Sequence, residues 1–280
     1  LFTIANLRRY IRFFGCDWSV AASMVRYALP LIPTNIFWWI TNASDAFFIA
    51  YYLGQGANGL LTVAYKVPTI INLLAGIFSD AWQLSAFTED QQGRTRFFSN
   101  VFASYQALIF TSASGLILLC KWINRILAYG EYYESWRFIP VLLLATSFSC
   151  LVSFLGTIYM LEKKSFATLV TTALGAGINI ILNMTLIPNF GVQGGVVATL
   201  AGYLVVFTVR IIDTRRIVPL HCQPFKLLLN LALLGVQTHI LLTFETGWLL
   251  PEIGLCLVVT ALNFRLLLQN VQRLLMRRRS

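Results

Sequence analysis

The sequence predicts an all-α membrane protein, a polytopic bundle of about eight transmembrane helices. Of its 280 residues, 58% are hydrophobic and only 11% are charged, and the mean hydropathy is +0.72. Soluble domains have about a quarter of their residues charged. The apolar residues also gather into runs of about 20, the length that crosses a bilayer as a helix. Together these observations exclude an ordinary soluble domain.

The first element, residues 1–27, is predicted to be an amphipathic helix on the membrane surface. Its apolar residues recur at helical spacing with arginines between them, which is typical of an interfacial helix. The apolar set is Ile4, Leu7, Ile11, Phe14 and Trp18, and the basic set is Arg8, Arg9 and Arg12.

Eight apolar segments come after it, and short polar turns separate most of them. They cover about 29–53, 58–82, 99–120, 138–160, 166–187, 191–212, 225–244 and 247–266. We predict a transporter lobe of six transmembrane helices over residues 28–215 and two additional helices over 216–270. Residues 271–280 form a basic cytoplasmic tail.

The distribution of basic residues predicts the orientation, because Lys and Arg collect on the cytoplasmic side. With the N-terminus inside, only Lys121, Arg125 and Arg137 of the 21 basic residues lie outside, and Lys66 lies within the membrane. We therefore expect a multi-pass membrane protein with both termini cytoplasmic. The net charge of +10 is then explained by topology, and no nucleic-acid partner is expected.

The sequence lacks the motifs of common membrane enzymes. It has no Walker A sequence, no HExxH, no GxSxG and no aspartate-rich diphosphate motif. Its five cysteines are scattered without a CxxC pair, which indicates neither a metal site nor a disulfide framework. We expect no enzyme, cofactor or metal.

The most informative residues are Asp45 and Lys66, two ionisable groups inside predicted membrane spans. Asp45 lies eight residues before Leu53, where the first span ends, and Lys66 lies eight residues after Asn58, where the second begins. At ~1.5 Å rise per residue, both lie roughly 12 Å below the outer surface. Opposite charges at one depth in a low-dielectric medium are expected to pair.

Two interpretations of this pair remain open. In the first, it is a structural ion pair that holds two helices together. In the second, both residues line a water-filled cavity in which Lys66 binds an anionic pyrophosphate and Asp45 binds a proton or cation.

Further polar residues accompany the pair and are candidates for binding substrate. Trp38 and Asn42 share a helical face with Asp45, and Asn35 is close by. Tryptophan stacks on sugar rings and amides bond hydroxyls, which suits a saccharide. Asn72 in the second span and Asn179 in the fifth complete the set, although amides also bond across helices for purely structural reasons.

Several motifs give the chain a family resemblance. The motifs are Leu29-Pro30-Leu31-Ile32-Pro33, Trp38-Trp39-Ile40, Asn42-Ala43-Ser44-Asp45, Tyr65-Lys66-Val67-Pro68, Ala81-Trp82-Gln83, Tyr132-Tyr133 with Trp136, Phe154-Leu155-Gly156-Thr157, and the run from Asn179 to Gly195. In these motifs, over about residues 1–215, the chain resembles the polysaccharide-repeat-unit flippases of the multidrug/oligosaccharidyl-lipid/polysaccharide exporter superfamily. The resemblance implies the cytoplasmic membrane of a prokaryote.

The resemblance implies a two-lobed bundle of twelve or fourteen helices that moves an undecaprenyl-pyrophosphate-linked oligosaccharide between leaflets by alternating access. It implies roles in capsule, O-antigen or other surface polysaccharide export, and membrane lipids and polysaccharide assembly proteins as partners. The chain is similar to the second lobe and the helices after that lobe. We therefore expect a missing N-terminal lobe, on a longer chain or on a partner.

Two alternatives are kept beside this hypothesis. One is a multidrug or cation antiporter of the same superfamily, although an intramembrane lysine beside the deep carboxylate would repel cationic drugs. The other is a membrane-embedded glycosyltransferase or polymerase. It would need a large outer loop with catalytic charges, and the longest outer loop, about 121–137, is short.

Overall fold

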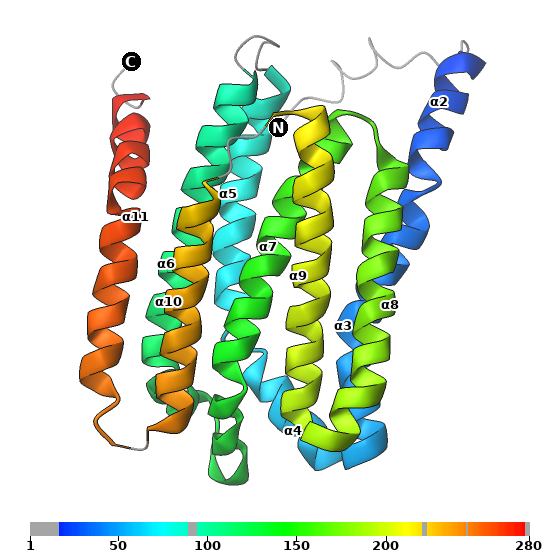
Figure 1. Ribbon diagram of the computed structural model, residues 1–280. Coiled ribbons are helices and arrows are strands. Elements are labelled where there is room, and N and C mark those ends of the chain that lie inside the picture. The colour runs from blue at the N-terminus through cyan, green and yellow to red at the C-terminus, as the bar shows by residue number, and fades with distance from the viewer. Residues whose placement is uncertain (1–16, 89–93, 220–222, 245, 278–280) are drawn as a thin grey trace, which may run out of the picture.

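The protein is a bundle of long helices packed side by side (Figure 1). The computed structural model describes residues 17–88, 94–219, 223–244 and 246–277. Every regular element within these ranges is helical, which confirms the predicted all-α fold. Residues 1–16, most of the predicted interfacial helix, lie outside the described part.

The elements succeed one another with short links. They are α2 Trp18–Ala28, α3 Leu31–Leu53, α4 Gln55–Ala64, α5 Thr69–Thr88, α6 Arg94–Leu127, the 3-10 helix η1 Gly130–Arg137, α7 Ile139–Leu161, α8 Ser165–Phe190, α9 Val192–Ile217, α10 Pro224–Thr243 and α11 Leu249–Arg277.

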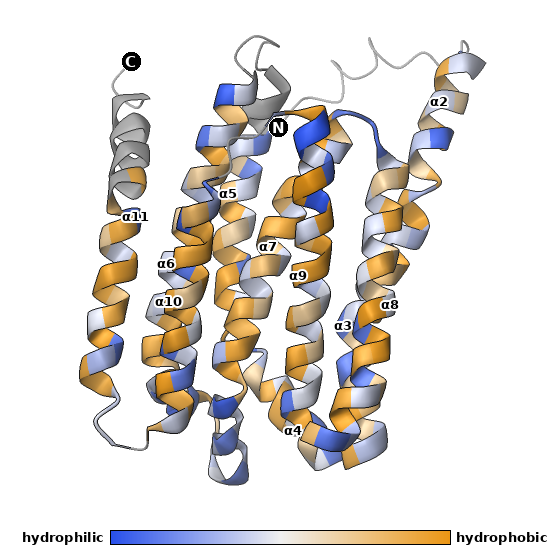
Figure 2. Cartoon of the chain, in the orientation of Figure 1, coloured by the Kyte–Doolittle hydropathy of each residue, from blue (hydrophilic) through white to orange (hydrophobic). Residues whose placement is uncertain are grey.

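The number of membrane-length helices agrees with a multi-pass protein. Among the described residues, five helices are long and apolar enough to span a bilayer, and the bent pair α4–α5 makes up to six. The five are α6 to α10. The other two predicted spans also exist as helices, but α3 contains the polar residues Asn35, Asn42 and Asp45, and the apolar described part of α11, Leu249–Phe264, is short. Figure 2 shows the apolar residues along the middle of the bundle.

The second predicted span is broken where the sequence placed a proline. Helices α4 and α5 meet at an angle of 43°, and residues 65–68 between them form turns. Pro68 has no N–H to donate within a helix, so the ladder is interrupted here. The span is therefore bent at this point, and Tyr65 and Lys66 lie in the break.

Two glycines allow tight turns at the same end of the bundle. Gly54 (φ 88°) joins α3 to α4, and Gly191 (φ 63°) joins α8 to α9. Positive φ is accessible to glycine at little cost. The α3–α4 hairpin brings the break at residues 65–68 back along α3.

Helix α7 lies in the centre of the bundle, with 89% of its most apolar window buried. The ring of Phe154 packs against Trp82 at 4.5 Å, Phe102 at 5.3 Å and Tyr105 at 5.4 Å between centroids. These contacts tie α5, α6 and α7 together.

Small residues let α8 and α9 approach closely. A Cβ added at Gly194 would lie 2.3 Å from the Leu186 carbonyl oxygen, and one at Gly202 would lie 3.4 Å from the Asn179 Cβ. The glycines of α9 are therefore packing residues at this contact. Their close approach also brings the polar face of α8 against α9.

Candidate functional site

The carboxylate of Asp45 lies at the centre of a buried polar cluster. Asp45 is on α3 and is 0% exposed. Side chains from three other parts of the fold surround it: Tyr65 from the α4–α5 break, Asn179 and Asn183 from α8, and Thr199 from α9.

Each carboxylate oxygen of Asp45 accepts two hydrogen bonds. The Nδ2 groups of Asn183 and Asn179 donate to Oδ1 over 2.7 and 3.3 Å. The Tyr65 hydroxyl donates to Oδ2 over 2.9 Å, and the Thr199 hydroxyl donates to the same oxygen. No cationic side chain of the described residues is among these partners. Neutral donors therefore stabilise the buried group in place of a counter-ion.

The neighbouring side chains contribute further oxygens to the cluster. The Ser44 hydroxyl donates to Asn179 Oδ1 and accepts from Asn183 Nδ2 over 3.3 Å. The Oδ1 atom of Asn183 is buried and has no hydrogen-bond partner in the described part of the chain. An amide oxygen is an acceptor with two lone pairs, so this oxygen is available to a bound cation.

The predicted ion pair between Asp45 and Lys66 does not form, and that prediction is wrong. Lys66 is exposed, and its side chain makes no ion pair with a described residue. The depth argument was correct, because the preceding residue, Tyr65, bonds to Asp45. Adjacent residues near a helix end point in directions about 100° apart, so Tyr65 faces inward while Lys66 faces outward.

The other candidates on α3 divide between the interior and an edge. Trp38 is half-buried, while Asn35 and Asn42 are exposed. The Tyr203 hydroxyl donates to Asn42 Oδ1 over 3.4 Å, and the rings of Trp38 and Tyr203 lie 5.8 Å apart. Asn42 and Trp38 therefore share α9 contacts with Asp45, whereas the Asn35 side chain makes no hydrogen bond with a described residue.

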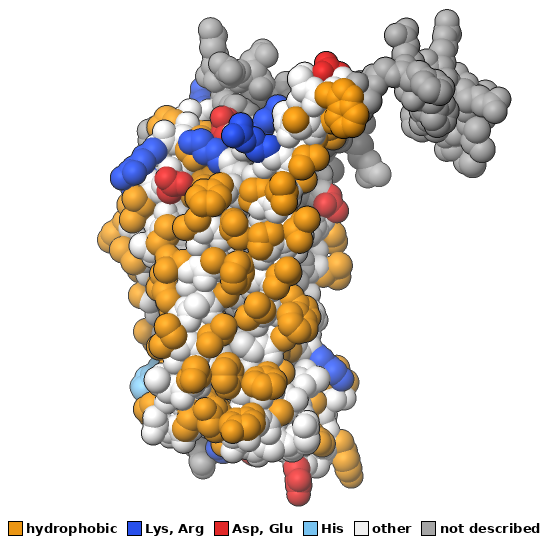
Figure 3. All heavy atoms as spheres, turned by 90° about the vertical axis from the view of Figure 1, so that its right-hand side faces the viewer, with side chains coloured by type: hydrophobic (Ala, Val, Ile, Leu, Met, Phe, Trp, Pro, Cys, Tyr) orange, Lys and Arg blue, Asp and Glu red, His pale blue; other side chains and the backbone are white. Residues whose placement is uncertain are grey.

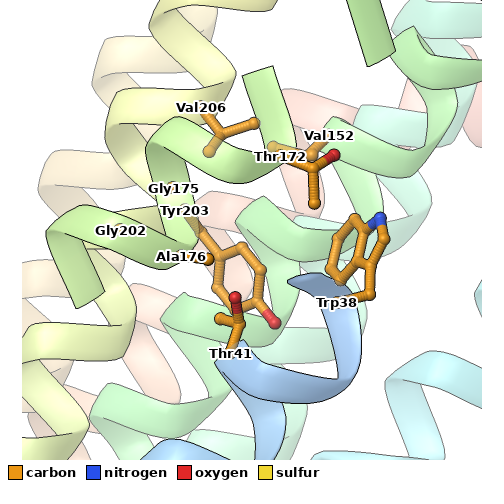
Figure 4. Close-up of a pocket in the computed structure, with 9 residues that line it drawn as sticks. All are labelled: Trp38, Thr41, Val152, Thr172, Gly175, Ala176, Gly202, Tyr203 and Val206. Carbon is orange, nitrogen blue, oxygen red and sulfur yellow. The ribbon is translucent and has the colours of Figure 1, made fainter. Parts of the chain in front are cut away.

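A narrow pocket lies beside these residues. Figure 4 shows Trp38 and Thr41 of α3 facing Tyr203 of α9, with Gly175, Ala176 and Gly202 along the wall. Its volume is about 10 Å³, room for about one water molecule. A sugar cannot enter it in this conformation.

Asn72 lies apart from the Asp45 cluster. It is exposed on α5, and its Oδ1 accepts a weak bond from Cys150 Sγ of α7 over 3.6 Å. Of the predicted site residues, the structure thus gathers Asp45 and Asn179 in one cluster, with Trp38 and Asn42 beside it. Lys66, Asn35 and Asn72 are exposed and have no hydrogen bond with the cluster.

The sequence analysis missed several members of the cluster. Ser44 and Tyr65 stand next to residues that were selected, and Asn183 lies one turn after Asn179 on the same face. Those spacings were signals that could have identified them. Thr199 carried no such signal, since only the fold places it opposite Asp45.

A second buried carboxylate, also missed, lies in the C-terminal helix pair. Glu252 of α11 is 0% exposed and accepts a bond from Gln237 Nε2 of α10 over 3.0 Å. Gln237 Oε1 accepts in turn from the Ser114 hydroxyl of α6 over 2.7 Å. This chain of hydrogen bonds attaches α10 and α11 to α6.

Metal-ligand clusters of three or more His, Cys, Asp or Glu are absent from the described residues. The oxygens around Asp45 are instead hydroxyl, amide and carboxylate, the donor types that hard cations prefer. The cluster can hold a proton on Asp45 or a small cation among these oxygens.

Comparisons with known proteins agree with this architecture. Residues 2–137 match the model of a family described as "polysaccharide biosynthesis protein". The fold is similar to that of the lipid II flippase MurJ in an inward closed conformation, with a TM-score of 0.59 and 18% sequence identity. The similarity covers 97% of this chain and 57% of that one, so the chain spans little more than half of its length. No curated protein sequence matches the chain.

Proposed function

We propose that the chain is one lobe of a lipid-linked oligosaccharide flippase. Two findings support this proposal: the fold is similar to that of a flippase, and residues 2–137 match a polysaccharide-biosynthesis family. Together they support membership of a polysaccharide or lipid-linked flippase family. The proposed flippase moves undecaprenyl-pyrophosphate-linked repeat units across the cytoplasmic membrane by alternating access. The proposal needs a second lobe, on the same chain or on a partner.

The observation that carries the proposal is the exposed Lys66 in a broken helix of an apolar bundle. Lysine in a membrane span is costly and marks a pathway by default. Lys66 has no ion pair with any described carboxylate, so its charge is available to a phosphate ligand. Because it lies in the break between α4 and α5, a modest change of backbone can move it. We assign it to the pyrophosphate.

The saccharide is assigned to exposed side chains of α3 and α5, which we call the substrate edge. Asn35, Asn42 and Asn72 are exposed amides that can bond hydroxyls, and Trp38 offers an aromatic face. The narrow pocket at Trp38 is too small for a sugar, so this edge binds the substrate across a cavity shared with the other lobe.

Coupling to an ion is assigned to the Asp45 cluster. A flippase that works against a gradient needs a site whose occupation differs between its two conformations. Asp45 is bonded by groups from the α4–α5 break, α8 and α9, so occupation by a proton or a sodium ion changes how these helices are held together. Asn179, first assigned to substrate, is assigned here to the ion site.

The test replaces Lys66 in cells that depend on this protein for surface polysaccharide. Lys66→Ala is expected to abolish export, and Lys66→Arg to retain part of it because the positive charge remains. Arg125→Ala is the matched control, because Arg125 is an exposed cation that the proposal gives no role. Protein levels in the membrane are compared by immunoblot. Equal export by wild type and Lys66→Ala would sink the assignment.

A cation-coupled drug antiporter is the second candidate, since a buried carboxylate that has no cationic partner among the described residues suits that activity too. A deletion strain separates the two: loss of surface polysaccharide with unchanged drug resistance supports the flippase, and the reverse supports the antiporter.

The polymerase alternative needs catalytic charged residues on the outer side of the membrane. In the outer link η1, Glu134 is instead ion-paired with Arg137 at 2.8 Å.

A further inference from the structure

A basic cleft lies between α2 and the beginning of α8, at the end of the bundle that the positive-inside count assigns to the cytoplasm. Its volume is about 580 Å³. One wall is formed by Arg26, Tyr27 and Pro30, and the other by residues 163–167. Neither the Asp45 cluster nor the substrate edge includes any of these residues.

Three cationic side chains line the cleft. Arg26, Lys163 and Lys164 are all exposed, and none forms an ion pair with a described residue. Figure 3 shows Lys and Arg side chains gathered near one end of this face, next to a broad apolar surface. A ligand that touches both is anionic at one end and apolar at the other.

The backbone at Lys163 holds the lysines in place at a conformational cost. Lys163 has φ 54°, the only described non-glycine residue with positive φ. Its amide bonds to Met160 O over 3.1 Å and that of Lys164 to Tyr159 O over 2.8 Å, which is the Schellman ending of α7. Glycine is the usual residue at this position, so lysine here is a costlier choice.

An unpartnered hydroxyl lies at the base of the cleft. Ser165 is only 6% exposed, and its side chain has no hydrogen-bond partner among the described residues. It is the first residue of α8, which has no side-chain cap. Its hydroxyl and the unpaired amides of the first turn of α8 are donors for an anion.

An apolar stripe continues from the cleft along α8 toward the middle of the bundle. Phe166, Val170 and Leu174 are 68%, 50% and 43% exposed. A second groove of about 500 Å³ adjoins the cleft through Phe166 and includes Val209 and Ile212 of α9. The same groove also contains Asp213 and Arg216, so an acyl chain that descends from the cleft lies on the apolar stripe of α8.

We propose that this cleft binds the phosphodiester headgroup of an anionic glycerophospholipid from the cytoplasmic leaflet. Arg26, Lys163 and Lys164 neutralise the phosphate, Ser165 donates to it, and the acyl chains lie along Phe166, Val170 and Leu174. A lipid bound there bridges α2 and α8. Asn179 and Asn183, the residues of α8 in the Asp45 cluster, are buried and do not face it.

Binding is measured by native mass spectrometry of the purified full chain in detergent, titrated with phosphatidylglycerol and, separately, with phosphatidylcholine. Phosphatidylglycerol is expected to bind more tightly. Lys163→Gly is expected to weaken it about fivefold, and Lys163→Gly with Lys164→Gln about 30-fold, since each basic residue near a lipid surface is worth about 1 kcal/mol. Because glycine suits the positive φ, loss of fold cannot explain weaker binding by Lys163→Gly.

Two control variants make the result decisive. Lys164→Arg keeps the charge and is expected to keep the affinity, and Arg125→Gln, at the other end of the bundle, is expected to change nothing. Equal affinity of wild type and the double variant for phosphatidylglycerol would overturn the proposal. So would equal binding of phosphatidylcholine, full competition by inorganic phosphate, or a preference for polyprenyl pyrophosphate. The experiment measures lipid binding and not transport, so its result does not depend on whether the flippase proposal is correct.

Discussion

Two buried charges on opposite sides of the α8–α9 contact are held in different ways. Asp45 is surrounded by side-chain amides and hydroxyls. Arg210 of α9, 1% exposed, donates to the Val152 carbonyl of α7 over 2.8 Å and to the hydroxyls of Thr171 and Thr172 of α8 over 3.0 and 2.9 Å. Neither charge has an ion pair with a described residue.

The difference lies in what each set of partners can do. One of the amides around Asp45 has an oxygen that is unpaired among the described residues, and a carboxylate can take up a proton. Arg210 stays charged at any physiological pH, and one of its acceptors is a fixed backbone carbonyl. We infer that the Asp45 cluster can exist in two states, while Arg210 is a permanent connection between α7, α8 and α9.

The largest effect is expected from Arg210→Ala. It removes a large buried side chain and its hydrogen bonds, so we expect a loss of about 3–5 kcal/mol in the free energy of unfolding. Thermal unfolding in detergent measures it. Arg210→Met, which fills the space without the charge, is expected to lose less. Wild-type stability in Arg210→Ala would contradict the structural role.

A smaller loss in the free energy of unfolding is expected from a substitution that places a methyl group against the Arg210 guanidinium. A Cβ at Gly156 would lie 2.8 Å from Arg210 Nη1, so Gly156→Ala forces the side chain to shift. We expect a cost of about 1–3 kcal/mol. Gly177→Ala is the matched control, because a Cβ there meets nothing within 4 Å. Similar unfolding temperatures for the two variants would contradict the close contact.

The smallest effect on stability is expected at the Asp45 cluster. Tyr65→Phe removes one hydrogen bond to the carboxylate and leaves three, at a cost of about 1–2 kcal/mol. Ion-coupled export is expected to fall more than stability does, because the cluster loses its link to the α4–α5 break. If export is unchanged while the protein is destabilised, Tyr65 is only structural.

The sequence predicted best those features of the fold that depend on the residues of a single helix. The lengths of the apolar runs predicted the helices. The sequence also placed Asp45 and the α4–α5 break at one depth. Depth alone does not fix the direction of a side chain, and so Lys66 was chosen as the partner in place of Tyr65.

Contacts between distant helices were beyond the sequence. Thr199 meets Asp45 only because α8 and α9 pack closely beside α3. Arg210 was counted with the cytoplasmic charges, since it stands at the end of an apolar run, yet α7 and α8 enclose it. Lone polar residues in such positions acquire their roles from the helices that pack around them.

The most direct test of the central claim, that the Asp45 cluster is functional, is a leaflet-accessibility measurement with Asp45→Asn. Cells carrying wild type or the variant at equal membrane levels receive an impermeant reagent that labels the oligosaccharide of lipid-linked intermediates on the outer face. We predict that Asp45→Asn remains folded but unfolds at a lower temperature than wild type, because its amide nitrogen cannot accept the hydrogen bonds that a carboxylate oxygen accepts, and that outer-face labelling is lost. Labelling equal to wild type by folded Asp45→Asn would contradict the account.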